Sequence, residues 1–239
     1  TIHEIFPMTE TSEISAIENV LSTKRLFIAD GHHRYETSLN FCKNSQKSGQ
    51  APESYQYMMM YLVDMATEAM TILPTHRVLK LDNFDLSDLL NKLPNDYKVS
   101  DPLAFADVSP ASDDPEKVTF DLYALGRVVR IEGRRDSLVG LNNETPAPIS
   151  KRLDTSILQD TIFGPLLDIA SGDPRLSFKQ DILEATSLVD SDEATLAVFL
   201  RPTEMNQIIG VAEAGEKMPQ KSTFFYPKPR SGLVINGLD

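Results

Sequence analysis

The stretch that most constrains this chain is an apolar run at residues 26–29, which stops abruptly at Asp30 and Gly31. From Tyr35 onward, apolar residues recur at the helical spacing i, i+4 and i+7. The pattern predicts a strand, a tight turn and a helix that runs to about Gln46. The side chains with the most chemical potential lie at the turn and in the first helical turn.

The predicted turn has the properties of an anion site. The first amides of a helix lack intrahelical partners, and the helix dipole places partial positive charge there, so phosphate binds well. Gly31 allows the backbone to approach a ligand, and Arg34 offers a bidentate grip on phosphate or carboxylate. His32 and His33 can donate hydrogen bonds, shuttle protons or bind a metal. The simpler interpretation is that Asp30 only caps the helix and its neighbours are solvated.

The run at 28–37 resembles the signature of a bacterial and archaeal family known as domain of unknown function 1015. A second match covers 218–228 and continues at 231–235, and a third covers 72–77. The matches lie in the family's order and span nearly the whole chain. Members of this family carry an additional N-terminal region, so the resemblance implies that this chain is a C-terminal portion.

More distantly, the strand, turn and helix around Asp30 are similar to a motif of the ParB/sulfiredoxin-like superfamily. That superfamily includes a nucleotide-binding partition protein, an ADP-dependent serine kinase and sulfiredoxin. In these proteins the equivalent turn cradles nucleotide phosphates. The similarity implies a phosphate site here without fixing a reaction.

The family resemblance adds further candidate residues. The local sequence around these residues does not by itself indicate a function. Lys221 with two neighbouring hydroxyls is a plausible phosphate-binding group, although a solvated basic stretch is an equally simple interpretation. Position 159, often histidine in relatives, is Gln159 here. The phosphate- or nucleotide-binding candidates besides Gly31 and Arg34 are Glu36, His76, Arg77, Lys221, Ser222, Thr223, Tyr226 and Lys228.

Composition limits the classes of function. The 239 residues suffice for one large domain or two small ones, and they carry a net charge of −12 without a block of Lys or Arg. Nucleic-acid binding requires a cationic surface and is therefore not expected. Cys42 is the only cysteine, which fits a cytoplasmic protein, and no signal peptide or membrane-spanning segment is recognisable.

Hydrophobic patterning predicts an α+β fold with a mixed sheet and helices. The nearly continuous apolar segment 55–65 is interpreted as a buried central strand. Two-residue alternation predicts a hairpin over 118–132. Arg134 and Arg135 are then expected in a solvated turn, and a final strand is expected at 233–236.

The segment 142–150 contains two prolines and no periodicity, so it is the predicted boundary between subdomains. A ParB-like subdomain at 1–145 would carry the turn, and a C-terminal α/β portion at 146–239 would pack on it. The acidic, Pro- and Ser-rich segment 105–117 is the best candidate for a mobile loop.

These features support an enzyme that transfers a phosphoryl group or hydrolyses a nucleotide on a small, phosphate-bearing substrate. Arg77 and Lys221 would offset the charge that develops on the transferred group. His32 or His33, with Asp30, would supply the catalytic acid or base.

Mg²⁺ prefers a few carboxylates together with phosphate oxygens, so Asp30, Asp64 or Glu36 is a candidate ligand. The resemblance and the chemistry together predict a nucleotide as the second cofactor. The expected single site joins the segments 30–36, 76–77 and 221–228.

Two alternatives remain open at this point. A non-catalytic protein that senses a nucleotide or anion would use the same residues without turnover. A metal-dependent hydrolase would use His32, His33 and His76, but vicinal histidines rarely chelate one ion and no His-x-x-x-His pair is present.

Overall fold

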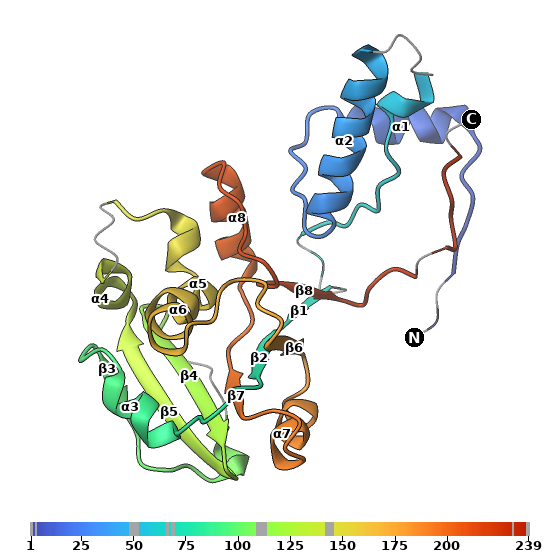
Figure 1. Ribbon diagram of the computed structural model, residues 1–239. Helices are drawn as coiled ribbons and strands as arrows, with labels where there is room; N and C mark the ends of the chain where they lie inside the picture. Colours follow the sequence, from blue (N-terminus) through green and yellow to red (C-terminus); the bar gives the residue numbers. More distant parts are fainter. Residues whose placement is uncertain are drawn as a thin grey trace. The chain divides into compact units, whose positions relative to one another are not determined.

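The computed structural model describes residues 2, 4–47, 53–65, 67, 70–108, 114–141, 146–230 and 232–237. The chain divides into two compact units (Figure 1): the first comprises Thr1–Met59 with Asn236–Asp239, and the second comprises Met60–Ile235. The division predicted after residue 145 stays a prediction, and that position lies in the second unit. Parts of three predicted features lie outside the described residues: the loop 105–117, the segment 142–150 and the motif at 231–235.

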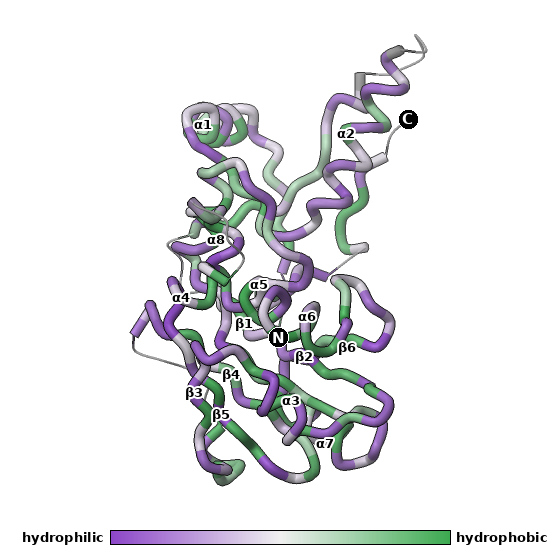
Figure 2. Tube along the Cα trace, turned by 60° about the vertical axis from the view of Figure 1, so that its left-hand side comes forward, coloured by the Kyte–Doolittle hydropathy of each residue, from purple (hydrophilic) through white to green (hydrophobic). Residues whose placement is uncertain are grey.

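The first unit is helical in its described part. It contains α1 (Thr11–Leu21), α2 (His32–Lys47) and the short 3-10 helix η1 (Glu53–Gln56). The rings of Phe41 in α2 and Tyr55 in η1 lie 4.9 Å apart, so these two elements pack on each other. Helix α2 follows the turn as predicted, and most of its residues are hydrophilic (Figure 2).

Two predicted strands are wrong. Residues 26–29 belong to no strand, and 57–64 form no regular element after η1. Large apolar side chains of the second segment are exposed, among them Tyr57 and Tyr61. A strand exists only where another segment pairs with it, and an apolar run carries no information about such a partner.

The second unit is built on a six-stranded sheet, and every pairing among its described strands is antiparallel. Together with the helices, this sheet confirms the α+β class. The β4–β5 pair confirms the predicted hairpin. In spatial order the strands are β3 (Tyr97–Val99), β5 (Arg127–Arg134), β4 (Lys117–Ala124), β7 (Leu196–Phe199), β2 (His76–Leu79) and β6 (Leu176–Lys179).

A separate two-stranded sheet pairs β1 (Thr71–Leu73) with β8 (Phe224–Tyr226) in antiparallel register. The strand predicted at 233–236 is absent, because these residues adopt turn and irregular conformations and Leu233, Val234 and Ile235 are exposed. The C-terminal strand therefore lies about ten residues earlier, inside the family motif at 218–228.

Helices cover both faces of the six-stranded sheet. None of the helices in the described ranges combines the length and apolar composition of a membrane span. The helical elements of this unit are α3 (Leu86–Lys92), η2 (Phe105–Asp107), α4 (Arg135–Gly140), η3 (Ile149–Arg152), α5 (Asp154–Leu158), the π-helix η4 (Gln159–Phe163), α6 (Gly164–Leu167), α7 (Ile182–Asp190) and α8 (Met205–Glu213).

The alternation of side chains along the strands creates two cores. Leu122 and Val198 face the larger core, which is closed by residues of α3, α5 and η4. Their neighbours Tyr123 and Phe199 face the opposite side and pack with Ala185 of α7. Both faces of the central strands are therefore buried, and this explains the high apolar content of β7 and of much of β4.

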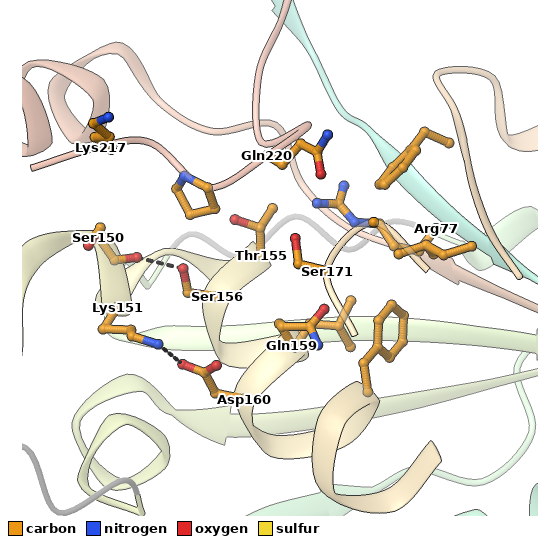
Figure 3. A pocket seen from close by; sticks show the side chains of 16 residues that line it. Arg77, Ser150, Lys151, Thr155, Ser156, Gln159, Asp160, Ser171, Lys217 and Gln220 are labelled. Carbon is orange, nitrogen blue, oxygen red and sulfur yellow. Dashed lines mark hydrogen bonds and ion pairs between the residues drawn. The ribbon is translucent and has the colours of Figure 1, made fainter. Parts of the chain in front are cut away.

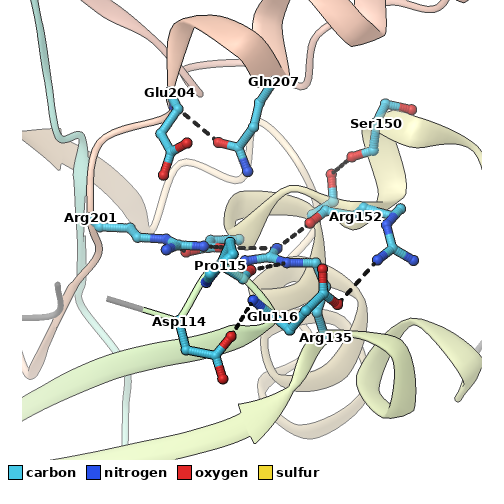
Figure 4. A network of polar contacts seen from close by, with 11 residues as sticks. Asp114, Pro115, Glu116, Arg135, Ser150, Arg152, Arg201, Glu204 and Gln207 are labelled. Carbon is cyan, nitrogen blue, oxygen red and sulfur yellow. Dashed lines mark hydrogen bonds and ion pairs between the residues drawn. The ribbon is translucent and has the colours of Figure 1, made fainter. Parts of the chain in front are cut away.

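One buried carboxylate, that of Asp154, ties the connecting segments to this unit. Arg135 Nη1 lies 2.8 Å from Asp154 Oδ1, and Arg201 Nε lies 2.7 Å from Oδ2. Figure 4 shows the side chains of Arg135 and Arg201 within the surrounding polar network. Arg135 Nε also donates to the carbonyl of Pro115 at 3.0 Å. The prediction that Arg135 lies in a solvated turn is wrong, because its side chain is buried and forms this ion pair inside the unit.

We expect Asp154→Asn to lower the free energy of unfolding by about 3–5 kcal/mol, because it leaves two buried guanidinium groups without a counter-ion. Urea unfolding of the purified variant measures this change. The matched control is Asp136→Asn, which removes an exposed partner of Arg152 and is expected to cost about 1 kcal/mol or less. Equal losses of unfolding free energy in the two variants would contradict the role of Asp154 as the counter-ion of the two arginines.

Candidate functional site

The signature turn has the local geometry that its sequence predicts. Helix α2 begins at His32, and Gly31 before it has a φ of +86°. The Gly31 amide donates to Asp30 Oδ1 at 2.9 Å. A Cβ added to Gly31 would lie only 2.8 Å from Arg34 Nη2. Glycine is therefore favoured here by its backbone conformation, and the absence of a Cβ leaves room for the Arg34 guanidinium beside it.

The side chains of His33 and Arg34 at this turn are accessible, and each forms only a long ion-pair contact. Arg34 Nη2 lies 3.7 Å from Asp30 Oδ2, and the Arg34 side chain is 73% exposed. His33 Nδ1 lies 3.8 Å from Glu36 Oε2, and His32 is also exposed. Exposed ion pairs of this length contribute about 1 kcal/mol at most. Arg34 can therefore exchange its carboxylate partner for an anion at little cost.

The second unit places two further candidates on neighbouring positions of β2. His76 is 1% exposed, its Nδ1 accepts the Leu200 amide at 3.3 Å, and its ring stands edge-on to Phe199. Burial, and then the charge of Arg77, lower the pKa of His76 to about 4. The imidazole is therefore neutral at pH 7 and part of the core.

Arg77 is buried without a carboxylate. It is 5% exposed, its Nη1 donates to the carbonyl of Thr75, and its guanidinium lies 5.1 Å from the centre of the Phe178 ring. Burial lowers the pKa of Arg77 to about 10. Within the residues that the structure describes, no Asp or Glu forms an ion pair with it.

Arg77 lines a cavity of about 320 Å³ in the second unit. His76 does not line it, because consecutive residues of a strand face opposite sides of the sheet. In Figure 3 the guanidinium of Arg77 and the side chains of Ser171 and Gln220 point toward the same space, whereas the hydroxyl of Thr155 is turned away from Arg77. The Thr155 hydroxyl is buried and has no hydrogen-bond partner.

The sequence singles out Arg77 and Gln159 of this cavity, but not Thr155, Ser171 or Gln220. The last three come from separate segments, and no spacing within the sequence connects them. Gln159 opens the π-helix η4, and its Nε2 donates to the carbonyl of Ile169 at 2.7 Å. Only contacts between distant segments reveal this group.

The C-terminal motif has a partly structural role. Ser222 is buried, its hydroxyl donates to the carbonyl of Pro219 at 2.7 Å, and its own carbonyl accepts from the Thr203 hydroxyl at 2.8 Å. Lys221 is exposed with a φ of +55°. Lys228 Nζ lies 4.6 Å from the centre of the Phe224 ring.

The remaining candidates of this unit are less constrained. Thr223 is half-buried, Tyr226 is exposed at the end of β8, and Asp64 is exposed. The described part of the chain contains no group of three or more His, Cys, Asp or Glu residues that could hold a metal ion. A single carboxylate such as that of Asp30 remains compatible with a Mg²⁺ ion bound mainly by phosphate oxygens. The joining of the turn with Arg77 and Lys221 in one site stays a prediction.

Comparison with known proteins gives one family match. The model of the family described as "Protein of unknown function (DUF1015)" matches residues 1–156. The search of curated proteins found no match.

Among solved structures, the chain is distantly similar to free serine kinase in complex with AMP, with 16% identity and a TM-score of 0.44 over 91% of this chain and 81% of that one. A mutant of free serine kinase in complex with ADP has the same identity and coverage and a TM-score of 0.42. A conserved hypothetical protein from Pyrococcus furiosus has 16% identity and a TM-score of 0.44, over 89% of this chain and 81% of that one.

The low pKa of His76 predicts a pH dependence of stability. The unfolded chain protonates this imidazole near pH 6.5, whereas the folded protein resists protonation until about pH 4. The unfolded state therefore binds more protons between these values, and the His76 contribution of about 3 kcal/mol is lost as the pH falls through this window. His76→Gln keeps an acceptor for the Leu200 amide and should show a correspondingly flatter curve of unfolding free energy against pH. Parallel curves for the two proteins would contradict a buried neutral His76.

Proposed function

The chain belongs to the DUF1015 family of proteins of unknown function, and we propose that its turn at 30–34 binds the phosphate groups of a nucleotide. The observation that carries this proposal is the arrangement of three features at one point: Gly31 with positive φ, the start of the 16-residue helix α2, and the guanidinium of Arg34 close to that glycine. Amides without intrahelical partners and a guanidinium together suit a phosphate.

The weak pairing of this turn supports ligand exchange. In the free protein, Asp30 accepts from the Gly31 amide and lies near Arg34. An incoming phosphate would take over Arg34 and the helix amides. The neighbouring Asp30 carboxylate would add one oxygen ligand to a Mg²⁺ ion held mainly by phosphate oxygens.

The reaction that fits this turn is phosphoryl transfer or nucleotide hydrolysis on a small substrate. His32 and His33 are exposed beside the phosphate position, so either can act as the acid or base. Adjacent helix positions point in different directions, so one of the two faces the ligand. A sensor that binds the nucleotide without turnover is the second candidate function.

The first test is a thermal-shift screen with AMP, ADP, ATP, CTP, GTP, pyrophosphate and phosphate, with and without Mg²⁺. The panel includes AMP and ADP, the nucleotides in the free serine kinase structures. A ligand that binds the native state raises the unfolding midpoint, and we expect Arg34→Ala to abolish most of that shift. The matched control is Lys43→Ala, which removes an exposed cation from the same helix about two and a half turns away and should keep the shift.

The outcome of this screen is decisive for the turn. A nucleotide shift that Arg34→Ala and Lys43→Ala reduce equally would reflect general electrostatics and contradict a specific site. Absence of a shift with every nucleotide would contradict the nucleotide proposal itself.

Enzyme and sensor differ in what a histidine substitution removes. For an enzyme, either His32→Gln or His33→Gln should lower turnover about 10²-fold or more while changing the nucleotide affinity little. Product formation from the nucleotide found in the screen measures turnover, and calorimetric titration measures affinity. Undetectable turnover in the unsubstituted protein, with intact nucleotide binding, would favour the sensor.

A further inference from the structure

We propose that the cavity around Arg77 is a second binding site, which takes the carboxylate or phosphate group of a small molecule. All of its residues belong to the second unit, so this inference does not rest on the function proposed for the turn at 30–34.

Arg77 carries a positive charge that is buried in the fold. Buried cations in proteins are normally paired, because a charge removed from water must regain its interactions elsewhere. The other deeply buried arginine cluster follows this rule, since Arg135 and Arg201 share the carboxylate of Asp154. Arg77 is buried to the same degree and has only the carbonyl of Thr75 and the Phe178 ring.

Several N–H donors of Arg77 have no acceptor within the described residues. A guanidinium carries five N–H groups in a planar fork. Within the described residues, Nη1 alone donates a hydrogen bond, and Nε and Nη2 have no acceptor. An oxyanion with two oxygens in one plane matches such a fork.

Neutral hydrogen-bonding groups also line the space beside Arg77. Figure 3 shows the side chains of Ser171 and Gln220 facing the space in front of the Arg77 guanidinium. These neutral groups can complete the coordination of an anion bound to Arg77.

The electrostatic balance of the wall favours an anion as well. Its charged residues are Arg77, Lys151, Lys217 and Asp160. Within the described part of the chain, Asp160 pairs with Lys151 at 2.8 Å and forms no ion pair with Arg77. The volume of about 320 Å³ lies at the lower end of the range for small-molecule sites, so the ligand is a small one.

The backbone beside the cavity is unusual in a way that fits a binding site. Gln159 begins the π-helix η4, and Asp160 and Phe163 of the same element also line the cavity. Single turns of π-helix are rare and occur frequently at functional sites. Gln159 in this widened turn lines the same cavity as Arg77.

The test uses the full chain with Arg34→Ala, so that the turn does not contribute. Sodium phosphate and sodium acetate are titrated separately against sodium chloride at equal ionic strength. The reporter is the Nε–Hε cross-peak of Arg77 in the ¹H–¹⁵N spectrum, which is assigned by its loss in Arg77→Met. We expect a saturable shift with phosphate, with acetate or with both, and the responding anion identifies the group that the cavity takes. A cross-peak that neither anion moves would overturn the proposal.

Discussion

The second unit depends on the sharing of one buried carboxylate, that of Asp154, by Arg135 and Arg201. This interaction fixes the start of α5 against the segment that follows β5 and the segment that follows β7. The next residue along α5 is Thr155, which lines the Arg77 cavity. The same short helix therefore supplies the carboxylate that neutralises two arginines and part of the wall of the cavity that a third arginine lines.

The contrast between these arginines connects the fold with the proposed functions. Arg135 and Arg201 have a carboxylate within the protein, so they stabilise the structure without a ligand. Arg77 has none in the described part of the chain, and Arg34 has only a weak, exposed one. A cation whose counter-ion is missing or readily exchanged is available to a ligand. By this criterion each of the two units offers an anion-binding group.

Local patterns in the sequence predicted the elements that local interactions determine. The helix after Gly31 and the hairpin of β4 and β5 are found where spacing and turn residues place them. The strands expected at 26–29 and 55–65 are absent, because strand formation depends on a partner that an apolar run does not specify. Burial of Arg135 and convergence of Ser171 with Arg77 depend on contacts between distant segments, which no motif encodes. Of the residues that line this cavity, the family resemblance singled out Arg77 and Gln159.

The most direct test of this account is the free energy of unfolding of Arg77→Met in buffer without oxyanions. Methionine keeps most of the apolar packing and removes a buried charge that lacks a counter-ion, so the account predicts a stability equal to or higher than that of the unsubstituted protein. Added phosphate or acetate should then stabilise only the protein with Arg77. A loss of more than about 2 kcal/mol in the anion-free buffer would show that Arg77 is already neutralised within the fold, and would contradict the account.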